Sequence, residues 1–186
     1  MPAARICHDF HRSHGMTLIE QIMVLAIGAI LASIAVPSLH KMLSRNTLRV
    51  AQTNFIAGLQ HAREAAIISN QRTLFCPTND NRSCSDDLRW DRGWLLGHDR
   101  DGDNQPDHGP LYTGPGYAGK VIIRSSKGRR IVRFHPDGSA SGSNITLLFC
   151  QPSNSESALS VIVSNAGRIR GAPATVQQAA ACVKDD

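Results

Sequence analysis

The feature that most constrains this chain is one long apolar stretch near its N-terminus. Residues 16–36 contain no basic residue and a single acidic one, Glu20. About 20 apolar residues in an α-helix are enough to cross the roughly 30 Å of hydrocarbon in a bilayer. A carboxylate deep in lipid costs about 2.5–3.5 kcal/mol, so we expect Glu20 to have a partner there. The stretch therefore predicts a membrane-spanning helix over residues 16–37.

A short basic segment precedes this stretch. Residues 1–15 carry Arg5 and Arg12 against Asp9, and positive charge beside a membrane helix is typical of its cytoplasmic side. A secretory signal peptide has its small-residue cleavage site after the apolar region. Here the only glycine at the charged-to-apolar junction, Gly15, comes before it. Cleavage at Gly15 would remove residues 1–15 and keep the helix, and the alternative is an uncleaved single-span anchor.

The motif Gly-Met-Thr-Leu-Ile-Glu at residues 15–20, with the apolar run after it, resembles the class III leader of type IV pilins and pseudopilins. The resemblance implies that prepilin peptidase cleaves after Gly15, that Met16 is N-methylated, and that Glu20 pairs with the N-terminal amine of a neighbouring subunit. Met16 is a departure, because most of the family carries Phe there. The resemblance further implies a single-pass protein of the bacterial inner membrane with a periplasmic head, which assembles with other pilins into an extracellular pilus.

Four cysteines follow the apolar stretch, while Cys7 lies in the leader. An even number of cysteines in an exported segment predicts disulfides, and the sequence permits three pairings. We favour Cys76 with Cys84, which closes a short loop, and Cys150 with Cys182, which ties the C-terminal tail to an expected strand. The alternative is a zinc site, which is disfavoured because the sequence has no Cys-x₂-Cys pair.

Helical periodicity continues beyond Pro37. Apolar residues recur at spacings of three and four, which places them on one helix face. They are Leu48, Ala51, Phe55, Leu59, Ala62 and Ala66. We therefore expect one helix over residues 17–69, kinked at Pro37 and ended by Asn70 and Gln71, whose second half packs on a sheet.

Short β-like runs follow this helix, separated by clusters of Gly, Pro, Asn and Ser. They cover residues 73–76, 93–96, 121–124, 131–134, 145–150 and 159–163. Residues 126–129 and 136–139 have the composition of hairpin turns. A long helix followed by antiparallel strands predicts an α+β fold with one head domain over residues 38–186.

Four blocks of sequence in this region resemble the GspH/FimT family of minor pilins and pseudopilins. They are residues 74–84, 90–103, 134–150 and 161–170. The resemblance covers nearly the whole chain. It implies the type IV pilin fold, in which a long kinked N-terminal helix packs on antiparallel sheet, and it makes an enzyme unexpected.

The segment Gly167-Arg168-Ile169-Arg170 is the main candidate for binding. In an extended strand Arg168 and Arg170 point to one face, about 6.6–7 Å apart, while Ile169 points to the core. Two guanidinium groups at that spacing can contact successive phosphates of a nucleic acid. The segment resembles the Gly-Arg-x-Arg motif of FimT proteins that bind DNA in natural transformation. The structural alternative is that both arginines only keep an edge strand soluble.

Further basic residues lie around the expected turn at residues 126–129, and they would extend the surface if that turn lies beside Arg168. They are Lys120, Arg124, Lys127, Arg129, Arg130 and Arg133. With few aromatic residues available for stacking, we expect non-specific, salt-sensitive contacts to the backbone of double-stranded DNA. The alternative function is a purely structural minor pilin, or a GspH-like pseudopilin of type II secretion, that binds no nucleic acid.

The sequence contains three weaker signals, and we expect none of them to mark a cofactor, metal or catalytic site. Residues 99–103 with Asp107 resemble a calcium loop, but the spacing departs from the EF-hand and Asp-Gly sequences are also ordinary turns. Residues 114–119 match Gly-x-Gly-x-x-Gly, but they precede a strand instead of joining a strand to a helix. His98, His108 and His135 are not accompanied by a Gly-x-Ser-x-Gly or His-Glu-x-x-His motif.

Overall fold

The computed structural model describes residues 16–125, 128–152 and 154–182. The expected leader with its cleavage site at Gly15, and Lys127 of the basic cluster, lie outside the described residues. The chain divides into two compact units, residues 1–41 and residues 42–186, and each is described by itself.

The first helix, α1, runs from Leu18 to Ser69 and continues through Pro37. In the first unit, every described side chain is exposed although most are apolar. This part of α1 is long and apolar enough to cross a membrane by length and composition. Glu20 lies in its first turn, where the Glu20 amide donates to the hydroxyl of Thr17 over 3.4 Å.

In the second unit, α1 buries the face that its periodicity predicts. All six apolar positions expected from the spacing are buried, from Leu48 to Ala66. Gly58 is buried on the same face. A Cβ there would lie 2.5 Å from the Trp94 ring and 2.9 Å from the Phe75 ring, so the two rings leave no room for a larger side chain. Phe55 packs edge-on against Phe75 and Phe149, with ring centroids 5.9 and 5.2 Å apart. This aromatic cluster joins the helix to the strands.

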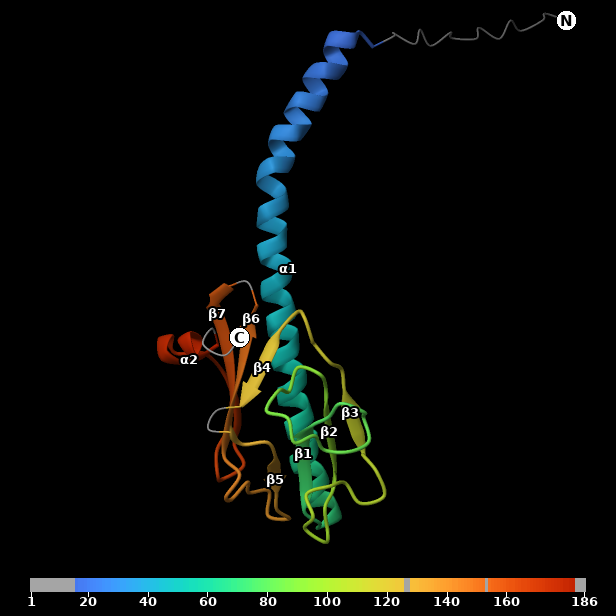
Figure 1. Cartoon of the computed structure of the whole chain (residues 1–186), viewed down its shortest axis with the longest axis vertical. Helices are drawn as coiled ribbons and strands as arrows, with labels where there is room; N and C mark the ends of the chain where they lie inside the picture. The colour runs from blue at the N-terminus through green and yellow to red at the C-terminus, as the bar shows by residue number, and fades with distance from the viewer. Residues whose placement is uncertain (1–15, 126–127, 153, 183–186) are drawn as a thin grey trace, which may run out of the picture. The chain divides into compact units, whose positions relative to one another are not determined.

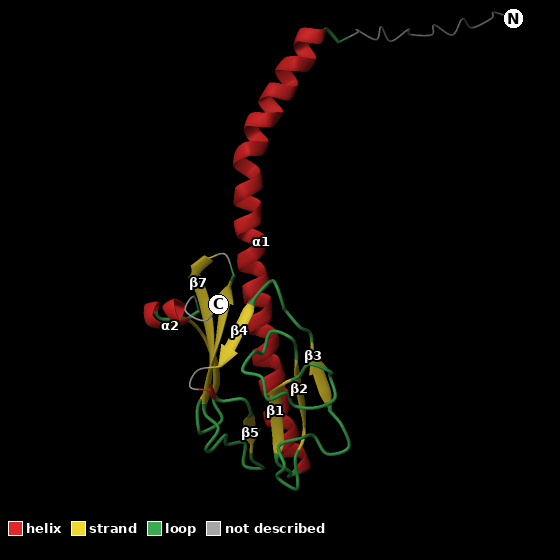
Figure 2. Cartoon of the chain, in the orientation of Figure 1, coloured by secondary structure: helices red, strands yellow, loops and turns green. Residues whose placement is uncertain are grey.

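The strands form two antiparallel four-stranded sheets beside the second half of α1 (Figures 1 and 2). Sheet A has the order β3-β2-β1-β5 and consists of Tyr112–Gly114, Trp94–His98, Thr73–Pro77 and Val132–Phe134. Sheet B has the order β4-β6-β7-β8 and consists of Ile122–Ser125, Ile145–Gln151, Asn154–Val163 and Ile169–Pro173. Both sheets contribute side chains to one core with α1.

Both predicted hairpins are wrong. β4 belongs to sheet B and pairs with β6, whereas β5 belongs to sheet A and pairs with β1. The chain therefore crosses between sheets after β4 and returns after β5. Residues 136–139 do reverse the chain, since the Gly138 amide donates to the His135 carbonyl over 2.8 Å. Turn composition predicts a reversal, but strand partners are chosen by segments distant in sequence.

Two elements are present that the sequence analysis did not predict. They are the short edge strand β3 and a C-terminal helix, α2, over Val176–Ala181. Thr175 caps α2, accepting a hydrogen bond from the Gln178 amide, and the Gln178 side chain accepts from the Thr175 amide. This reciprocal capping box satisfies amides at the start of the helix. Of the expected glycine loop, Gly114 ends β3 and the remaining residues lie outside helices and strands.

The favoured disulfides are both present. Cys76 pairs with Cys84 and Cys150 pairs with Cys182, with Cα atoms 5.6 and 6.0 Å apart. The second bond joins the end of α2 to β6, and α2 packs against β6 and β7. In Figure 1, α2 lies beside β7. The C-terminal tail is therefore fastened onto sheet B.

Candidate functional site

The two arginines of the C-terminal motif lie at the start of β8, the edge strand of sheet B. Both side chains are exposed, whereas Ile169 between them is partly buried against the core. Arg168 lies just before the strand, where its amide donates to the Ser164 hydroxyl over 3.2 Å and its carbonyl accepts from the Ser164 amide over 3.0 Å. The expected alternation of side chains is thus present.

The arginines share the face of sheet B that points away from α1. Leu147, Val161 and Val163 point into the core, so the residues that alternate with them point outward. On that outer face Thr146 lies opposite Ile162, and Ile162 lies opposite Arg170. Within the described residues, neither Arg168 nor Arg170 has a side-chain hydrogen bond or an ion pair. Both guanidinium groups are available to an anionic ligand.

Gly167 positions the motif through its backbone. It has a φ of +75°, and a Cβ at this position would clash with the carbonyl oxygen of Gly138. The turn at residues 136–139 and the turn before Arg168 are also joined by a hydrogen bond from the Ala140 amide to the Asn165 carbonyl, 2.8 Å long. A glycine is needed here both for the left-handed backbone and for this close approach.

Arg63 of α1 belongs to the same arrangement and was not singled out by the sequence analysis. Its Nε donates to the Gly138 carbonyl over 2.9 Å and lies 3.2 Å from the position of a Cβ on Gly167. The helix therefore holds both turns in place through one partly buried guanidinium. Helical spacing places Arg63 beside the apolar face. Its partner is 75 residues away in the sequence, so no local sequence pattern indicates the contact.

Arg129 is the member of the predicted basic cluster that lies near this motif. Its Nη1 donates to the Gly142 carbonyl over 2.7 Å, and its side chain lines a surface depression together with Ser164 and Asn165. Ser164 in turn contacts Arg168. Arg129 therefore lies on the surface that includes the turn before the two motif arginines.

The other described cluster members are spread over other parts of the head. Arg130 lies 3.4 Å from the carboxylate of Asp86, and Arg133 donates to the side chain of Asn104. Arg124 of β4 lies opposite Leu148 of β6 on the outer face of sheet B, and Lys120 is exposed in the loop before β4. The chain passes from sheet B to sheet A between β4 and β5, and this crossing separates residues that are neighbours in sequence.

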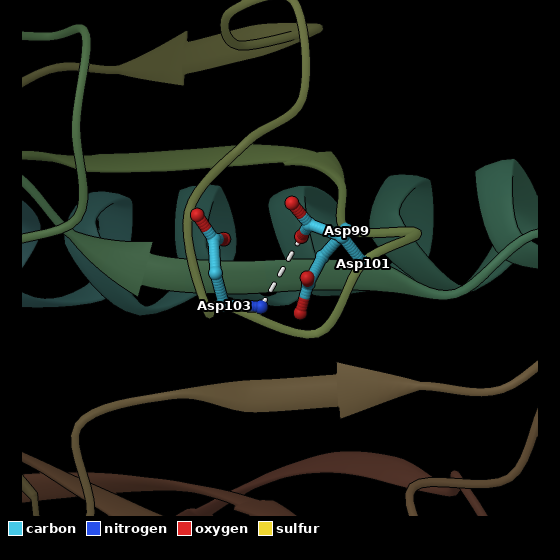
Figure 3. A group of neighbouring side chains, drawn as sticks. All are labelled: Asp99, Asp101 and Asp103. Atoms are coloured by element: carbon cyan, nitrogen blue, oxygen red, sulfur yellow. Dashed lines mark hydrogen bonds between the residues drawn. The ribbon is translucent and has the colours of Figure 1, made fainter.

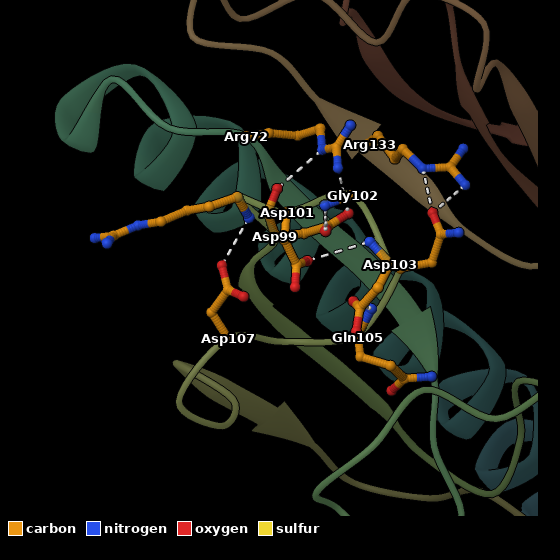
Figure 4. A network of polar contacts seen from close by, with 10 residues as sticks. Arg72, Asp99, Asp101, Gly102, Asp103, Gln105, Asp107 and Arg133 are labelled. Carbon is orange, nitrogen blue, oxygen red and sulfur yellow. Dashed lines mark hydrogen bonds and ion pairs between the residues drawn. The ribbon is translucent and has the colours of Figure 1, made fainter.

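The acidic loop at residues 99–107 forms a compact network (Figures 3 and 4). The carboxylate oxygens of Asp99, Asp101 and Asp103 lie within 4.8 Å of one another. Asp99 is fully buried, accepting from the Gly102 amide over 2.9 Å and lying 3.1 Å from Nη2 of Arg72. Because a guanidinium already balances the buried charge, this arrangement fits a structural loop.

The remaining carboxylates of this loop accept hydrogen bonds from its own backbone. Asp101 accepts from the Asp103 amide, Asp103 from the Gln105 amide and Asp107 from the Arg100 amide, over 3.2, 2.7 and 2.6 Å. Such bonds are the normal use of Asp in turns. The same loop also presents the Asn104 side chain to Arg133 of sheet A, whose Nε donates to it over 2.8 Å.

His98 has a structural role. It ends β2, and its Nδ1 lies 3.2 Å from the Thr73 hydroxyl on β1. Burial lowers the pKa of His98, and the charge of Arg100 lowers it further. The ring therefore favours its neutral form, which suits a hydrogen bond within the sheet.

Comparison with known families identifies the chain. The family described as type II transport protein GspH matches residues 51–167, well over half of the sequence. This chain belongs to the GspH family. The prokaryotic N-terminal methylation motif matches residues 10–36 of this GspH-family chain. Among proteins of curated function, no sequence match was found.

Solved structures share the fold. Type IV minor pilin FimU of Pseudomonas aeruginosa (strain PAO1) matches with a TM-score of 0.57 and 22% identity, covering 69% of this chain and 90% of that one. A second crystal form of FimU gives a TM-score of 0.54 and 21% identity, covering 67% and 92%. The minor pseudopilin EpsH from the Type 2 Secretion System of Vibrio cholerae matches with a TM-score of 0.49 and 13% identity, covering 67% of this chain and 95% of that one.

At these identities the likeness to FimU establishes the fold, which is α+β and of the type IV pilin kind, as predicted. The family consists of minor pilins and pseudopilins, which are structural proteins without catalytic activity. Membership implies assembly with other pilins. The methylation motif and the apolar part of α1 fit a pilin anchored in the membrane with a globular head.

Proposed function

We propose that this minor pilin binds DNA through Arg168 and Arg170 and serves DNA uptake in natural transformation. The supporting observation is the pair of exposed arginines on the outer face of sheet B, without a carboxylate partner among the described residues. Neither guanidinium group is engaged in an ion pair among the described residues. Each can form charge-assisted, bidentate hydrogen bonds to phosphate.

The expected binding is weak, non-specific and sensitive to salt. Each phosphate contact contributes about 0.9 to the slope of log K against log salt for duplex DNA. Two contacts therefore lower the affinity about tenfold between 50 and 200 mM salt. Arg129, on the same surface, adds a third contact if DNA spans the depression.

We infer the processing and location of the protein from its N-terminal motif. Prepilin peptidase removes residues 1–15 by cleavage after Gly15, Met16 is methylated, and residues 16–37 hold the chain in the inner membrane. Residues 38–186 then form the periplasmic head. Glu20 pairs with the amine of a neighbouring pilin during assembly into the pilus.

The second candidate is a structural subunit that binds no nucleic acid. The observation that favours it is the family itself, whose description is a type II transport protein. In that case Arg168 and Arg170 contact neighbouring subunits or water.

A gel-shift experiment distinguishes the two functions. The full chain, purified in a non-ionic detergent, is titrated into duplex DNA alongside a double variant with Arg168→Gln and Arg170→Gln. The matched control carries Arg82→Gln and Lys120→Gln, which remove the same charge from two exposed residues elsewhere on the head. The proposal predicts loss of binding in the first variant alone. Absence of a shift by the parent protein at low salt would refute DNA binding, and equal loss in both variants would refute the assignment to the motif.

A further inference from the structure

The outer face of sheet B carries a depression beside the two arginines. Its volume is about 410 Å³, within the range of small-molecule sites. Residues of three segments line it, namely Arg129, the start of β6 and the end of β7 with the turn that follows. A flat basic surface is enough to hold a phosphate backbone. The depression therefore needs a separate explanation.

The depression lies between two basic borders. Arg170 is directly opposite Ile162, and Ile162 is opposite Thr146, so these side chains form one row across β8, β7 and β6. Neighbouring strands are about 4.7–4.9 Å apart, so the row spans about 9–10 Å. Arg129 lines the β6 side, and on the β8 side Arg170 lies one strand beyond the lining residue Ile162.

The depression is closed at one end. The next row along the outer face contains Leu148 and Ser160, which are only 7% and 1% exposed. Helix α2 packs against β6 and β7, and the bond from Cys182 to Cys150 holds it on this face. A long ligand cannot pass through the depression in this direction, although a single group can enter it from the surface.

The lining suits a flat, polar ring. Ile162 supplies a partly buried apolar surface, while the side chains of Asn144, Thr146 and Asn165 supply hydrogen-bond donors and acceptors. The bond from Arg129 to the Gly142 carbonyl fixes one edge of its guanidinium plane. Guanidinium planes stack on nucleobases, and such stacking is tolerant of sequence.

We propose that this depression receives an unpaired nucleobase, so that the protein binds single-stranded DNA or a frayed strand end more tightly than blunt duplex. The inference rests on the proposed function, in which Arg168 and Arg170 hold the backbone next to the base. In duplex DNA a base must first be unstacked and unpaired to enter such a site, whereas in a single strand it is already free.

This preference runs opposite to that of phosphate contacts alone. Duplex DNA has the higher charge density and the steeper salt dependence, so a purely electrostatic surface binds duplex at least as well as a single strand. A surface with a base site also gains affinity for a single strand from the stacking of the bound base. The order of affinities therefore separates the two explanations.

The experiment measures affinity by fluorescence anisotropy with the full chain in detergent. Three probes carry equal numbers of phosphates: a blunt duplex, a single strand, and an abasic single strand that has the same backbone without bases. The expected result is that the single strand binds at least about fivefold more tightly than the abasic strand, which is the lower end of the contribution of one stacked base. It also binds more tightly than the duplex. Equal affinity for the single and abasic strands would overturn the proposal.

Filling the depression tests its location. Thr146→Leu places a branched, non-aromatic side chain over the floor and should abolish the preference for the single strand while leaving the abasic affinity unchanged. The matched control is Thr113→Leu on the exposed edge strand β3 of sheet A, which should leave the preference intact. Asn144→Leu, at an exposed position, provides a second filling variant should Thr146→Leu fail to fold. A preference retained in a folded filling variant would contradict the proposed site.

The two proposals fail in different ways. If no probe binds, or if Arg168→Gln and Arg170→Gln have no effect, DNA binding by the motif is wrong. If the probes bind through the motif arginines but the single strand has no advantage, only the base site is wrong.

Discussion

Substituting Gly167 by alanine tests how the turn before Arg168 is held. The φ of +75° strains any residue with a Cβ, at a cost of about 1–3 kcal/mol. The new Cβ would also displace the carbonyl of Gly138, which accepts the hydrogen bond from Arg63. Forced displacement of packed atoms adds about 1–3 kcal/mol. We therefore expect Gly167→Ala to lower the free energy of unfolding by about 2–6 kcal/mol.

Gly119→Ala is the matched control. Gly119 has nearly the same φ, +78°, but nothing lies within 4 Å of its Cβ position. Its substitution should therefore cost only the backbone strain, about 1–3 kcal/mol. The difference between the two variants measures the contact between the turns and not the general cost of losing a glycine.

Urea unfolding of the full chain in detergent, followed by tryptophan fluorescence, measures both variants. The chain has two tryptophans, Trp90 and Trp94, and they are 0% and 6% exposed in the core. Their emission therefore reports the loss of the head's packing. Equal destabilisation by Gly167→Ala and Gly119→Ala would refute the close contact with Gly138. Gly167→Ala should also weaken DNA binding if the turn positions Arg168.

Three further predictions concern other parts of the chain. Glu20→Ala should leave the head folded but reduce incorporation into pili, and normal incorporation in an assembly assay would contradict the pairing with a neighbouring amine. Replacing Cys150 and Cys182 by serine should lower the free energy of unfolding by about 3–4 kcal/mol, because the bond closes a loop of 32 residues; denaturation of parent and variant under identical conditions measures the loss. Amides of Ser83 and Arg82 hold the pKa of Asp80 well below its usual range, so its stabilisation is present above about pH 4 and declines as the pH falls. Asp80→Asn should make unfolding less dependent on pH between about 5 and 2, and an unchanged dependence would exclude Asp80 as a contributor.

Much of the helix and part of the site follow from local sequence. The spacing of Leu48, Phe55 and Leu59 predicts which face of α1 is buried, since a regular helix repeats every 3.6 residues whatever it packs against. The outward direction of Arg168 and Arg170 follows in the same way from the two-residue repeat of an extended strand. Such features depend only on neighbours along the chain.

The placement of the basic residues depends on the tertiary structure. Arg129 and Arg130 are adjacent in sequence, yet Arg129 lines the depression near Arg168 while Arg130 lies beside Asp86. Turn composition at residues 126–129 predicts a hairpin, but β4 and β5 find partners in different sheets. Arg63 reaches the Gly138 carbonyl across 75 residues.

The sequence by itself therefore determined the apolar helix, its buried face, the existence of the strands and the outward-facing arginine pair. Only the tertiary structure decided which basic residues accompany that pair and that a depression closed at one end lies next to it. The physical reason is the separation along the chain over which each interaction acts. Helix and strand periodicities arise from backbone geometry within a few residues, whereas sheet partners and side-chain contacts are selected by packing between segments far apart in the chain.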